Sequence, residues 1–451
     1  MFKNVFIKTF GCQMNERDSE IISQVLLDHG YLENGDMESA DLVILNTCTI
    51  RAKAEQKVMS LLGALRKCKE RKPDMRICVA GCVAQQEGER LIQRMPHVDV
   101  VMGTQNIYKI AGILERVNAT GKPVSATGMD KDFNIPAFLP QIQSSSDKET
   151  YHSRSFKRFV TIMQGCNNYC AYCVVPYTRG REISRNPDDI VNEIRLLVNQ
   201  GIKEITLLGQ NVNSYGMQSQ GTPLLCSFPQ LLHRIADIHG IQRLRFTTSH
   251  PKDLSDELIS CFSDIKILCP QFHLPVQSGS DAVLQRMNRK YTIARYLERV
   301  EKLWAARPDL ALTTDMIIGF PGETDADFAL TMDLLEKVRF YGSFSFKYSD
   351  RPRVRSAGFS GKIPEKVKSE RLTAYQKRQD EISLERNQTY LGAVLEVMVE
   401  STGENGFQGR TGTNHIVHVE ERTDLPPGEL AKIKIIHAGQ HSLKGKPSGK
   451  I

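Results

Sequence analysis

Hydrophobic and polar positions in the first hundred residues repeat one pattern three times. A short run rich in β-branched residues leads through a turn into a stretch of helical length, and the three runs span residues 4–10, 41–47 and 75–81. Strands that alternate with helices of ten or more residues are typical of βαβ units, which pair into a parallel sheet. We therefore predict an α/β domain with a parallel sheet over residues 1–118, with residues 98–104 as a further strand.

A cysteine follows each of the three runs directly. In an open parallel sheet, ligands bind beyond the carboxyl ends of the strands, so we expect Cys12, Cys48 and Cys82 to lie close together. Three thiolates in that position suit an iron-sulfur cluster. A buried cysteine is also often only a small apolar side chain, and we assign Cys78, inside its run, and Cys68, near a helix end, to the core.

The remainder of the chain predicts three further regions. Residues 119–151 are rich in Gly, Pro and Ser without a sustained period and are interpreted as a linker. Residues 152–382 hold six strand-like runs separated by helical segments, which predicts an open, partial TIM barrel because a full barrel needs eight. Residues 384–447 change to short alternating strands with Gly-rich turns, which predicts a small all-β, OB-like barrel of a kind that often binds oligonucleotides.

Composition narrows the class of protein. The 451 residues are 40% hydrophobic and 25% charged, which suits a globular chain of several domains. No stretch approaches the roughly 18 apolar residues of a membrane span, and the first residues lack the pattern of a signal peptide. We therefore expect a cytoplasmic protein, in which thiols stay reduced. The 11 cysteines then indicate metal or redox chemistry rather than disulfides.

Charge is informative mainly in one segment. The net charge is +7, and residues 351–380 hold nine Lys and Arg against three Asp and Glu. This basic stretch is either a solvated face or a surface for a polyanion. From residue 381 to the end, eight basic residues stand against nine acidic ones, so charge gives the terminal barrel no support as a nucleic-acid binder.

The strongest local motif is the CxxxCxxC set of Cys166, Cys170 and Cys173. Loops of this length can reach three irons of a 4Fe-4S cluster, and only three ligands are offered locally. A structural zinc site normally has four closed ligands, which disfavours zinc here. The fourth iron would be open to a small chelator, and the amino and carboxylate groups of S-adenosylmethionine (SAM) suit that position.

At this point the chain resembles the radical SAM methylthiotransferase family. The resemblance covers the first two domains and is carried by these segments: TFGCQMNERDSE (9–20), NTCTIRAKAEQKV (46–58), AGCVAQQEGERL (80–91), MGTQNI (102–107), GCNNYCAYCVVPYTRGREISR (165–185), TTSHPKDL (247–254), HLPVQSGSD (273–281) and DMIIGFPGET (315–324). It implies two 4Fe-4S clusters, an auxiliary one on Cys12, Cys48 and Cys82 and a radical-generating one on Cys166, Cys170 and Cys173.

The resemblance also implies roles for other residues. Contacts to SAM are expected from Tyr172, from Gly209, Gln210 and Asn211 after the second barrel strand, and from Gly319 and Glu323 in the turn after the fifth. His250 is a weaker candidate for a substrate contact. RNA contacts are expected from Arg179, Arg181, Arg185, Arg351, Arg353 and Arg355. The segment Arg351-Pro-Arg-Val-Arg355 departs from the Arg-Pro-Gly-Thr found in many family members, which leaves the shape of that loop open.

The implied reaction is methylthiolation at C2 of an N6-isopentenyl adenosine at position 37 of tRNA. One SAM would donate a methyl group and another would yield a 5'-deoxyadenosyl radical. The implied partners are the tRNA anticodon stem-loop, a sulfur source and an electron donor such as flavodoxin or ferredoxin, with no membrane partner and a monomeric chain. Alternatives are a methylthiotransferase for threonylcarbamoyl adenosine or for a ribosomal-protein aspartate, and a non-catalytic iron-sulfur RNA-binding protein.

Overall fold

The computed structural model describes residues 2–49, 52–130, 133–137, 155–217, 226–422 and 424–449. Its chain divides into two compact units. The first comprises residues 1–150, 159–167 and 174–196, and the second comprises residues 151–158, 168–173 and 197–451. Among the described residues no helix is both long and apolar enough to cross a membrane.

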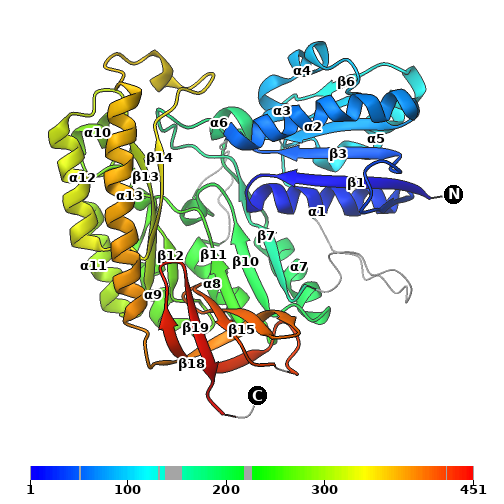
Figure 1. The fold of residues 1–451 in the computed structure, drawn as a ribbon. Helices are drawn as coiled ribbons and strands as arrows, with labels where there is room; N and C mark the ends of the chain where they lie inside the picture. Colours follow the sequence, from blue (N-terminus) through cyan, green and yellow to red (C-terminus); the bar gives the residue numbers. More distant parts are fainter. Residues whose placement is uncertain are drawn as a thin grey trace. The chain divides into compact units, whose positions relative to one another are not determined.

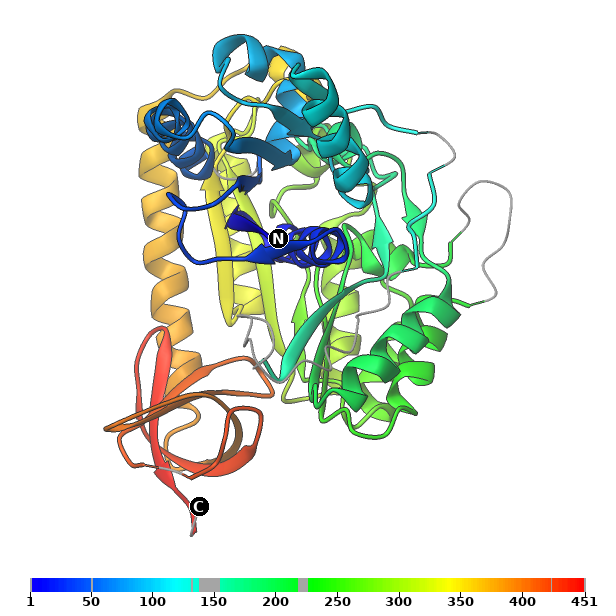
Figure 2. The same ribbon diagram turned by 90° about the vertical axis from the view of Figure 1, so that its right-hand side faces the viewer.

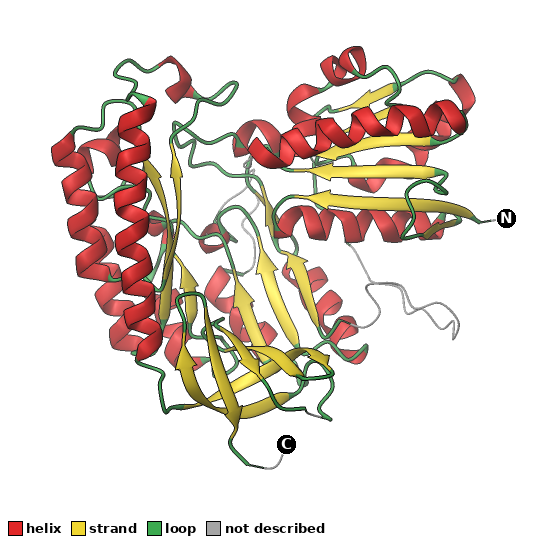
Figure 3. Ribbon diagram, viewed as in Figure 1, coloured by secondary structure: helices red, strands yellow, loops and turns green. Residues whose placement is uncertain are grey.

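A parallel sheet of six strands forms the centre of the first unit, in the order β2-β1-β3-β4-β5-β6 (Figures 1 and 3). The strands are β1 (Lys3–Phe10), β2 (Tyr31–Glu33), β3 (Leu42–Thr47), β4 (Arg76–Gly81), β5 (Val100–Met102) and β6 (Val124–Ala126). All neighbouring pairs are parallel, as predicted. The edge strands β2 and β6 were not predicted, and β6 lies within the residues interpreted as a linker. Most of the remaining linker, residues 131–132 and 138–151, lies outside the described residues.

Helices cover both faces of this sheet. They are α1 (Gln13–Asp28), α2 (Ala52–Arg71), α3 (Cys82–Glu87), α4 (Glu89–Arg94), η1 (Ile107–Lys109) and α5 (Ile110–Thr120). Apolar residues of α1 and α5 pack in one core cluster, and those of α2, α3 and α4 pack in another on the opposite face. Gly88, whose φ of 55° lies in the left-handed region, separates α3 from α4.

The segment that follows residue 155 begins the predicted barrel. Its elements are β7 (Lys157–Thr161), β8 (Met163–Gln164), α6 (Val175–Thr178), β9 (Ile183–Ser184) and α7 (Pro187–Asn199). Strands β8 and β9 form a two-residue antiparallel pair. This pair flanks the CxxxCxxC motif in sequence, so the motif occupies a loop that begins directly after a strand.

Six strands in two parallel sheets form the open barrel, which confirms the predicted number. The sheets are β11-β10-β7 and β12-β13-β14, and the further strands are β10 (Glu204–Leu208), β11 (Arg243–Phe246), β12 (Gln271–His273), β13 (Ala311–Ile318) and β14 (Gly342–Lys347). The helices are η2 (Val212–Ser214), α8 (Phe228–Ala236), η3 (Pro251–Asp253), α9 (Asp256–Asp264), α10 (Asp281–Arg286), α11 (Ile293–Ala306), α12 (Asp325–Val338), η4 (Arg355–Gly358) and α13 (Glu365–Gln388).

A closed five-stranded barrel ends the chain, in the order β15-β16-β17-β19-β18 (Figure 2). Its strands are β15 (Val394–Gly403), β16 (Gly406–Thr411), β17 (Ile416–Val419), β18 (Leu430–Ala438) and β19 (Ser442–Pro447). The small all-β barrel was predicted, but β16 and β19 were not recognised as strands because several glycines interrupt them. The predicted boundary at residues 382–384 falls inside α13.

Two buried arginines join this barrel to the larger one within the second unit. Nη1 of Arg243 donates to the carbonyl oxygen of Arg410 at 2.7 Å, and Nη1 of Arg245 donates to that of Gly412 at 2.9 Å. Both guanidinium groups start from β11 and reach backbone carbonyls of the terminal barrel. Because hydrogen bonds from charged donors are the stronger kind, these contacts fix the two barrels of this unit to each other.

Candidate functional site

The three strand-end cysteines of the first unit lie together, as the sequence predicts. Cys12 follows β1, Cys48 follows β3 and Cys82 begins α3 directly after β4. These strands are neighbours in the sheet. The Cys48 thiol forms side-chain hydrogen bonds with both Cys12 and Cys82. The sheet therefore assembles three thiols from positions 36 and 34 residues apart in sequence.

The electrostatic surroundings favour ionised thiols at two of these positions. The hydrogen bond with Cys48 lowers the pKa of Cys12 to about 6, against the opposing effect of burial, and the nearby Arg179 lowers it further. The same hydrogen bond lowers the pKa of Cys82 to about 7. Cys48, between them, has a raised pKa because its proton is shared with its two neighbours. Metal ligation needs thiolates, so this donor set fits an iron-sulfur cluster.

Arg179 and Asp18 form a buried ion pair beside these thiols. Nη2 of Arg179 lies 2.6 Å from Oδ2 of Asp18, and both side chains are almost completely buried. Burial alone would lower the pKa of Arg179, but Asp18 and the Cys82 thiol hold it well above its usual value. The Nη1 atom of Arg179 is buried and has no hydrogen-bond partner among the described residues. A permanent positive charge therefore faces the thiols.

This position changes the interpretation of two predicted RNA contacts. Arg179 is 3% exposed, and Arg185, also 3% exposed, pairs at 2.6 Å with the carboxylate of Glu193. Arg17 pairs with the same carboxylate. Neither Arg179 nor Arg185 is presented to solvent for a phosphate. Only Arg181 of the three predicted arginines in this segment has an exposed side chain.

Residues of the CxxxCxxC motif belong to both units, Cys166 to the first and Cys170 and Cys173 to the second. The backbone N–H of Cys166 donates to the carbonyl oxygen of Gly180 at 3.2 Å in the first unit. Gly165 before it has a φ of 81°, and a Cβ there would meet the carbonyl oxygen of Arg181 at 1.9 Å. In the second unit the N–H of Cys173 donates to the carbonyl of Cys170 at 3.0 Å, which closes a tight turn.

Within the described residues, no three His, Cys, Asp or Glu side chains converge to hold a single metal ion. A 4Fe-4S cluster differs from such a site because each thiolate binds a different iron. Its ligands therefore need not point at one atom. The hydrogen-bonded trio of Cys12, Cys48 and Cys82 offers the required chemistry, and the turn of Cys170 and Cys173 offers two thiols from one loop.

Arg289 is a candidate that the sequence reasoning missed. Its Nη1 lies 3.5 Å from Sγ of Cys170 and 3.5 Å from the Tyr172 hydroxyl. Its Nε donates to the Tyr291 hydroxyl at 3.1 Å, and its Nη2 donates to the carbonyl of Pro275 at 2.6 Å. The side chain is 4% exposed. No carboxylate pairs with it in the described part of the chain, so its charge is balanced only by the thiol and neutral acceptors.

Tyr172 stands at the predicted position in the motif, where its hydroxyl contacts Arg289. Burial raises its pKa well above the usual value, and Arg289 opposes that effect. The hydroxyl therefore stays protonated and neutral. The spacing of the cysteines could not reveal Arg289, because 119 residues separate it from Cys170.

Buried polar atoms without partners gather after β10 and β11. Among the described residues, Oδ1 of Asn211, Oδ1 of Asn213, Oγ of Ser249 and Nε2 of His250 are buried and have no hydrogen-bond partner. Buried polar groups are normally satisfied, so a group of four indicates a place where a ligand completes the hydrogen bonds. Asn211 was predicted here from the sequence, and its amide nitrogen donates to Asp253 at 2.7 Å.

His250 belongs to this polar group and stays neutral. Burial lowers its pKa, and the nearby positive charge of Arg289 lowers it further. Its Nδ1 accepts a hydrogen bond from the N–H of Lys252 at 3.2 Å, so the proton sits on Nε2, which is free to donate. The ring packs edge-on against Tyr291, with centroids 5.6 Å apart. Tyr291 thus connects His250 to Arg289. The other two predicted residues, Gly209 and Gln210, are buried and half-buried beside them.

The predicted turn from Gly319 to Glu323 is held by internal contacts. The N–H of Gly319 donates to both carboxylate oxygens of Glu323 at 3.1 Å, and Nη1 of Arg371 lies 2.7 Å from the same carboxylate. Burial raises the pKa of Glu323, against the effects of Gly319 and Arg371. Gly319 has a φ of 75°, which an L side chain rarely adopts. Glu323 therefore shapes this turn, and any contact with SAM would come from the backbone around it.

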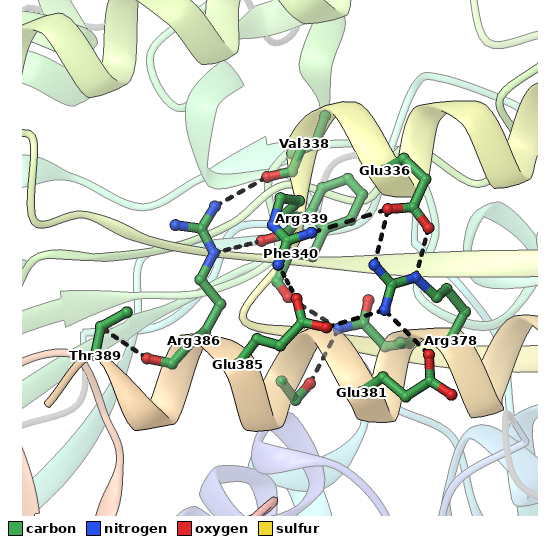
Figure 4. Close-up of polar contacts among 11 residues, drawn as sticks. Glu336, Val338, Arg339, Phe340, Arg378, Glu381, Glu385, Arg386 and Thr389 are labelled. Atoms are coloured by element: carbon green, nitrogen blue, oxygen red, sulfur yellow. Dashed lines mark hydrogen bonds and ion pairs between the residues drawn. The ribbon is translucent and has the colours of Figure 1, made fainter. Parts of the chain in front are cut away.

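Most of the basic stretch at 351–380 is neutralised within the fold. Five of its nine basic side chains form ion pairs: Lys362, Lys366, Lys368, Arg371 and Arg378. Figure 4 shows one such network, in which Arg378 of α13 contacts Glu336, Glu381 and Glu385. These pairs tie α13 to α12. Arg353 and Arg355, in contrast, have exposed side chains, and Arg351 is half-buried.

The comparisons with known proteins agree with both units. Residues 4–103 match the Uncharacterized protein family UPF0004, and residues 160–335 match the Radical SAM superfamily. A tRNA-2-methylthio-N(6)-dimethylallyladenosine synthase of Desulfotalea psychrophila is 56% identical over 98% of each chain. A protein of the same description from Geobacter sulfurreducens is 48% identical over 98% of this chain and 97% of its own.

A solved structure has the same fold at low sequence identity. It is the radical S-adenosylmethionine methyltransferase TsrM from Kitasatospora setae, with cobalamin and a [4Fe-4S] cluster bound. The TM-score is 0.58 at 15% identity, over 79% of this chain and 77% of that one. At this identity the similarity shows the fold alone.

Proposed function

Because this chain belongs to the family of tRNA-2-methylthio-N(6)-dimethylallyladenosine synthases, we propose that it methylthiolates N6-dimethylallyl adenosine at C2 in tRNA position 37. The observation that carries the proposal is 56% identity over 98% of the chain to a relative of that description. As a radical SAM enzyme of this family, the chain uses 4Fe-4S clusters and SAM. The electrostatic surroundings of its thiols suit that use.

We assign the two clusters to separate cysteine sets. Cys12, Cys48 and Cys82 would hold the auxiliary cluster, and Cys166, Cys170 and Cys173 would hold the radical-generating one. When bound, the clusters and SAM supply a 5'-deoxyadenosyl radical and a place to carry the transferred sulfur. The protein contributes fixed charge and exclusion of water. Arg179 stabilises the Cys12 thiolate at the first set, and the charge of Arg289 lies 3.5 Å from Sγ of Cys170 at the second.

The polar atoms after β10 and β11 are proposed to contact the cofactor and the base. His250 is neutral and carries a free N–H donor at Nε2, whereas Asn211 and Asn213 each offer a free amide oxygen. This combination of one donor and two acceptors can hydrogen-bond the polar edges of a methionine or adenine group without adding charge. Ligand binding would also satisfy the buried atoms, whose unmet hydrogen bonds otherwise cost stability.

The RNA contacts are proposed from exposed positive charge and the terminal barrel. Arg353 and Arg355 are exposed and Arg181 is exposed in the first unit, and phosphate contacts of this kind position RNA without reading sequence. The target base must be splayed out of the anticodon loop to be reached. We further propose a flavodoxin or ferredoxin as electron donor, a monomeric chain, and action in the cytoplasm where tRNA is found.

The alternatives have less support. A methylthiotransferase for threonylcarbamoyl adenosine or a ribosomal-protein aspartate would use the same clusters, but the relatives described above carry a dimethylallyladenosine name. A non-catalytic iron-sulfur RNA-binding protein would not need two sets of three thiols, because structural sites favour complete ligation.

The test uses anaerobically reconstituted protein, a reductant, SAM and tRNA. We expect 5'-deoxyadenosine to form, and dimethylallylated tRNA to gain the mass of a methylthio group at position 37. A tRNA that lacks the dimethylallyl group is the matched control and should gain little. Absence of 5'-deoxyadenosine would contradict the enzyme assignment, and methylthiolation of a threonylcarbamoyl adenosine instead would contradict the substrate.

A further inference from the structure

Two large aromatic side chains of β14, a strand of the open barrel, are exposed. Phe344 is 62% exposed and Phe346 is 51% exposed. On the opposite face of the strand, Ser343 and Ser345 accept hydrogen bonds from α13 side chains at 2.9 and 3.2 Å. Side chains alternate between the two faces of a strand. Because α13 covers one face from outside, Phe344 and Phe346 point to the inner face of the open barrel.

The neighbouring strands continue this inner face. In the parallel register, Asp315 of β13 lies beside Phe344, and Ile317 lies beside Phe346. His273 of β12 packs edge-on against Phe344, with ring centroids 6.0 Å apart, and its Nε2 lies 3.4 Å from Asp315. The surface is thus an apolar strip of three residues, Phe344, Phe346 and Ile317, with one polar pair at its edge. We call these three residues the β14 strip.

The β14 strip is continuous with the loop of the CxxxCxxC motif. Ile317 packs on a buried apolar cluster that contains Ala171, and Tyr172 packs on the same cluster. Ala171 and Tyr172 lie between Cys170 and Cys173 in the motif. An apolar group that lay on the strip would therefore be held at the carboxyl end of the barrel, where the active sites of such barrels are found.

We propose that the β14 strip receives the dimethylallyl-bearing adenine of the tRNA substrate, and this rests on the proposed function. The dimethylallyl group is a branched, uncharged five-carbon chain, which gains by leaving water for an apolar surface. The adenine ring has a π-face that stacks on aromatic side chains. Exposed phenylalanines in RNA-binding proteins serve this purpose. The strip thus selects tRNA that already carries the dimethylallyl group.

The test compares binding of two RNAs that differ only in the dimethylallyl group. Wild-type holoenzyme and the Phe344→Ala, Phe346→Ala double variant are titrated anaerobically with fluorescent anticodon stem-loops, one dimethylallylated at position 37 and one not. We expect wild type to prefer the dimethylallylated RNA. Since burial of one phenylalanine accounts for roughly 10- to 100-fold in affinity, the preference should fall to about one in the variant, with a smaller loss of affinity for the plain RNA, whose adenine loses only its stacking.

Leu330→Ala is the matched control. Leu330 is 48% exposed on α12, so its replacement removes a similar exposed apolar side chain away from the strip and should preserve the preference. A conservative variant, Phe346→Leu, keeps an apolar surface and should lose only part of the preference for the dimethylallylated RNA. An unchanged preference in the double variant would overturn the proposal, and so would an equal loss of affinity for both RNAs.

Failure of this inference can be separated from failure of the proposed function. The binding assay involves no chemistry, whereas the methylthiolation assay on wild type tests the function by itself. If wild type modifies dimethylallylated tRNA and the double variant retains its preference, only the role of the strip is wrong. If wild type prefers the dimethylallylated RNA in binding but modifies neither RNA, the proposed function is wrong and the proposed role of the strip in binding is retained.

Discussion

The two cysteine sites of this chain differ in how they are assembled and in how their charge is balanced. The sheet brings Cys12, Cys48 and Cys82 together from three different strand ends, whereas Cys166, Cys170 and Cys173 occupy eight consecutive residues. Each site has one buried arginine. The charge of Arg179 is compensated by Asp18, but Arg289 has no carboxylate partner in the described part of the chain.

This difference has an electrostatic consequence. A reduced cluster carries one more negative charge than an oxidised one, and an uncompensated guanidinium in a buried site stabilises that added charge. A cluster held at the loop site would therefore accept an electron more readily than one held at the strand-end site. The ion pair of Arg179 and Asp18 instead adjusts thiol ionisation with little net charge. The contrast suits a division into one site that is reduced and one that carries sulfur.

The largest expected effect comes from removing a thiol of the loop site. Cys170→Ala should abolish 5'-deoxyadenosine formation, because a cluster left with two protein thiolates is poorly held. The product is measured by chromatography after anaerobic incubation with SAM and a reductant. Cys261→Ala, at a buried cysteine on α9, is the control and should keep activity. Continued product formation by Cys170→Ala would contradict the assignment of the loop site.

The corresponding change at the strand-end site should separate the cleavage of SAM from the transfer of the methylthio group. Cys48→Ala is expected to retain much of the 5'-deoxyadenosine formation, while methylthio transfer to tRNA is lost. The protein should also hold about half the iron of wild type, since one of two four-iron clusters is absent. Iron quantitation and tRNA mass spectrometry check both points. Full methylthiolation by this variant would refute the role of Cys48.

A smaller effect is expected from neutralising the uncompensated arginine. Arg289→Gln should shift the reduction potential of the loop cluster to a more negative value. At a fixed solution potential the reduced fraction should fall roughly tenfold, because a hydrogen bond from a charged group contributes about 1.5–3 kcal/mol. Spectroscopic redox titration measures this without turnover. Lys290→Gln removes an equal but exposed charge one residue away, and an equal shift in both variants would show that burial of Arg289 is unimportant.

The smallest effect concerns pH at the strand-end site. The pKa values of Cys12 and Cys82, about 6 and 7, lie below the usual thiol value of 9.0. The part of cluster loading that depends on the Cys12 and Cys82 thiolates should therefore hold above pH 7 and fall as the pH drops through 7 and 6. Arg179 lowers both pKa values, so Arg179→Gln should move this fall to higher pH.

Iron content is the measurement for this prediction, made in a Cys170→Ala background so that only the strand-end cluster is counted. Arg181→Gln, at an exposed arginine, is the control. Asp18 raises the pKa of both thiols, so Asp18→Asn should shift loading in the opposite direction. Identical pH profiles in all variants would show that the ion pair of Arg179 and Asp18 does not affect cluster loading.

The elements and the local motifs follow from the pattern of residues along the chain. Periodicity predicted the parallel sheet, the six barrel strands and the small terminal barrel, because the spacing of apolar residues differs between strands and helices. Strand-end placement was enough to group Cys12, Cys48 and Cys82, since parallel strands share an edge. Periodicity did not reveal β2, β6, β16 and β19. These strands are short or interrupted by glycine, and their pairing depends on neighbouring strands rather than on their own pattern.

Tertiary contacts, by contrast, determine which charged side chains lie beside the thiols. Arg179 is neutralised by Asp18, 161 positions away in sequence, and the carboxylate that pairs with Arg185, Glu193, also pairs with Arg17, 176 positions away. Arg289 and Phe344 carry no local signal at all. Burial and ion pairing arise from residues distant in sequence, and a one-dimensional pattern records composition and spacing but not which distant groups meet.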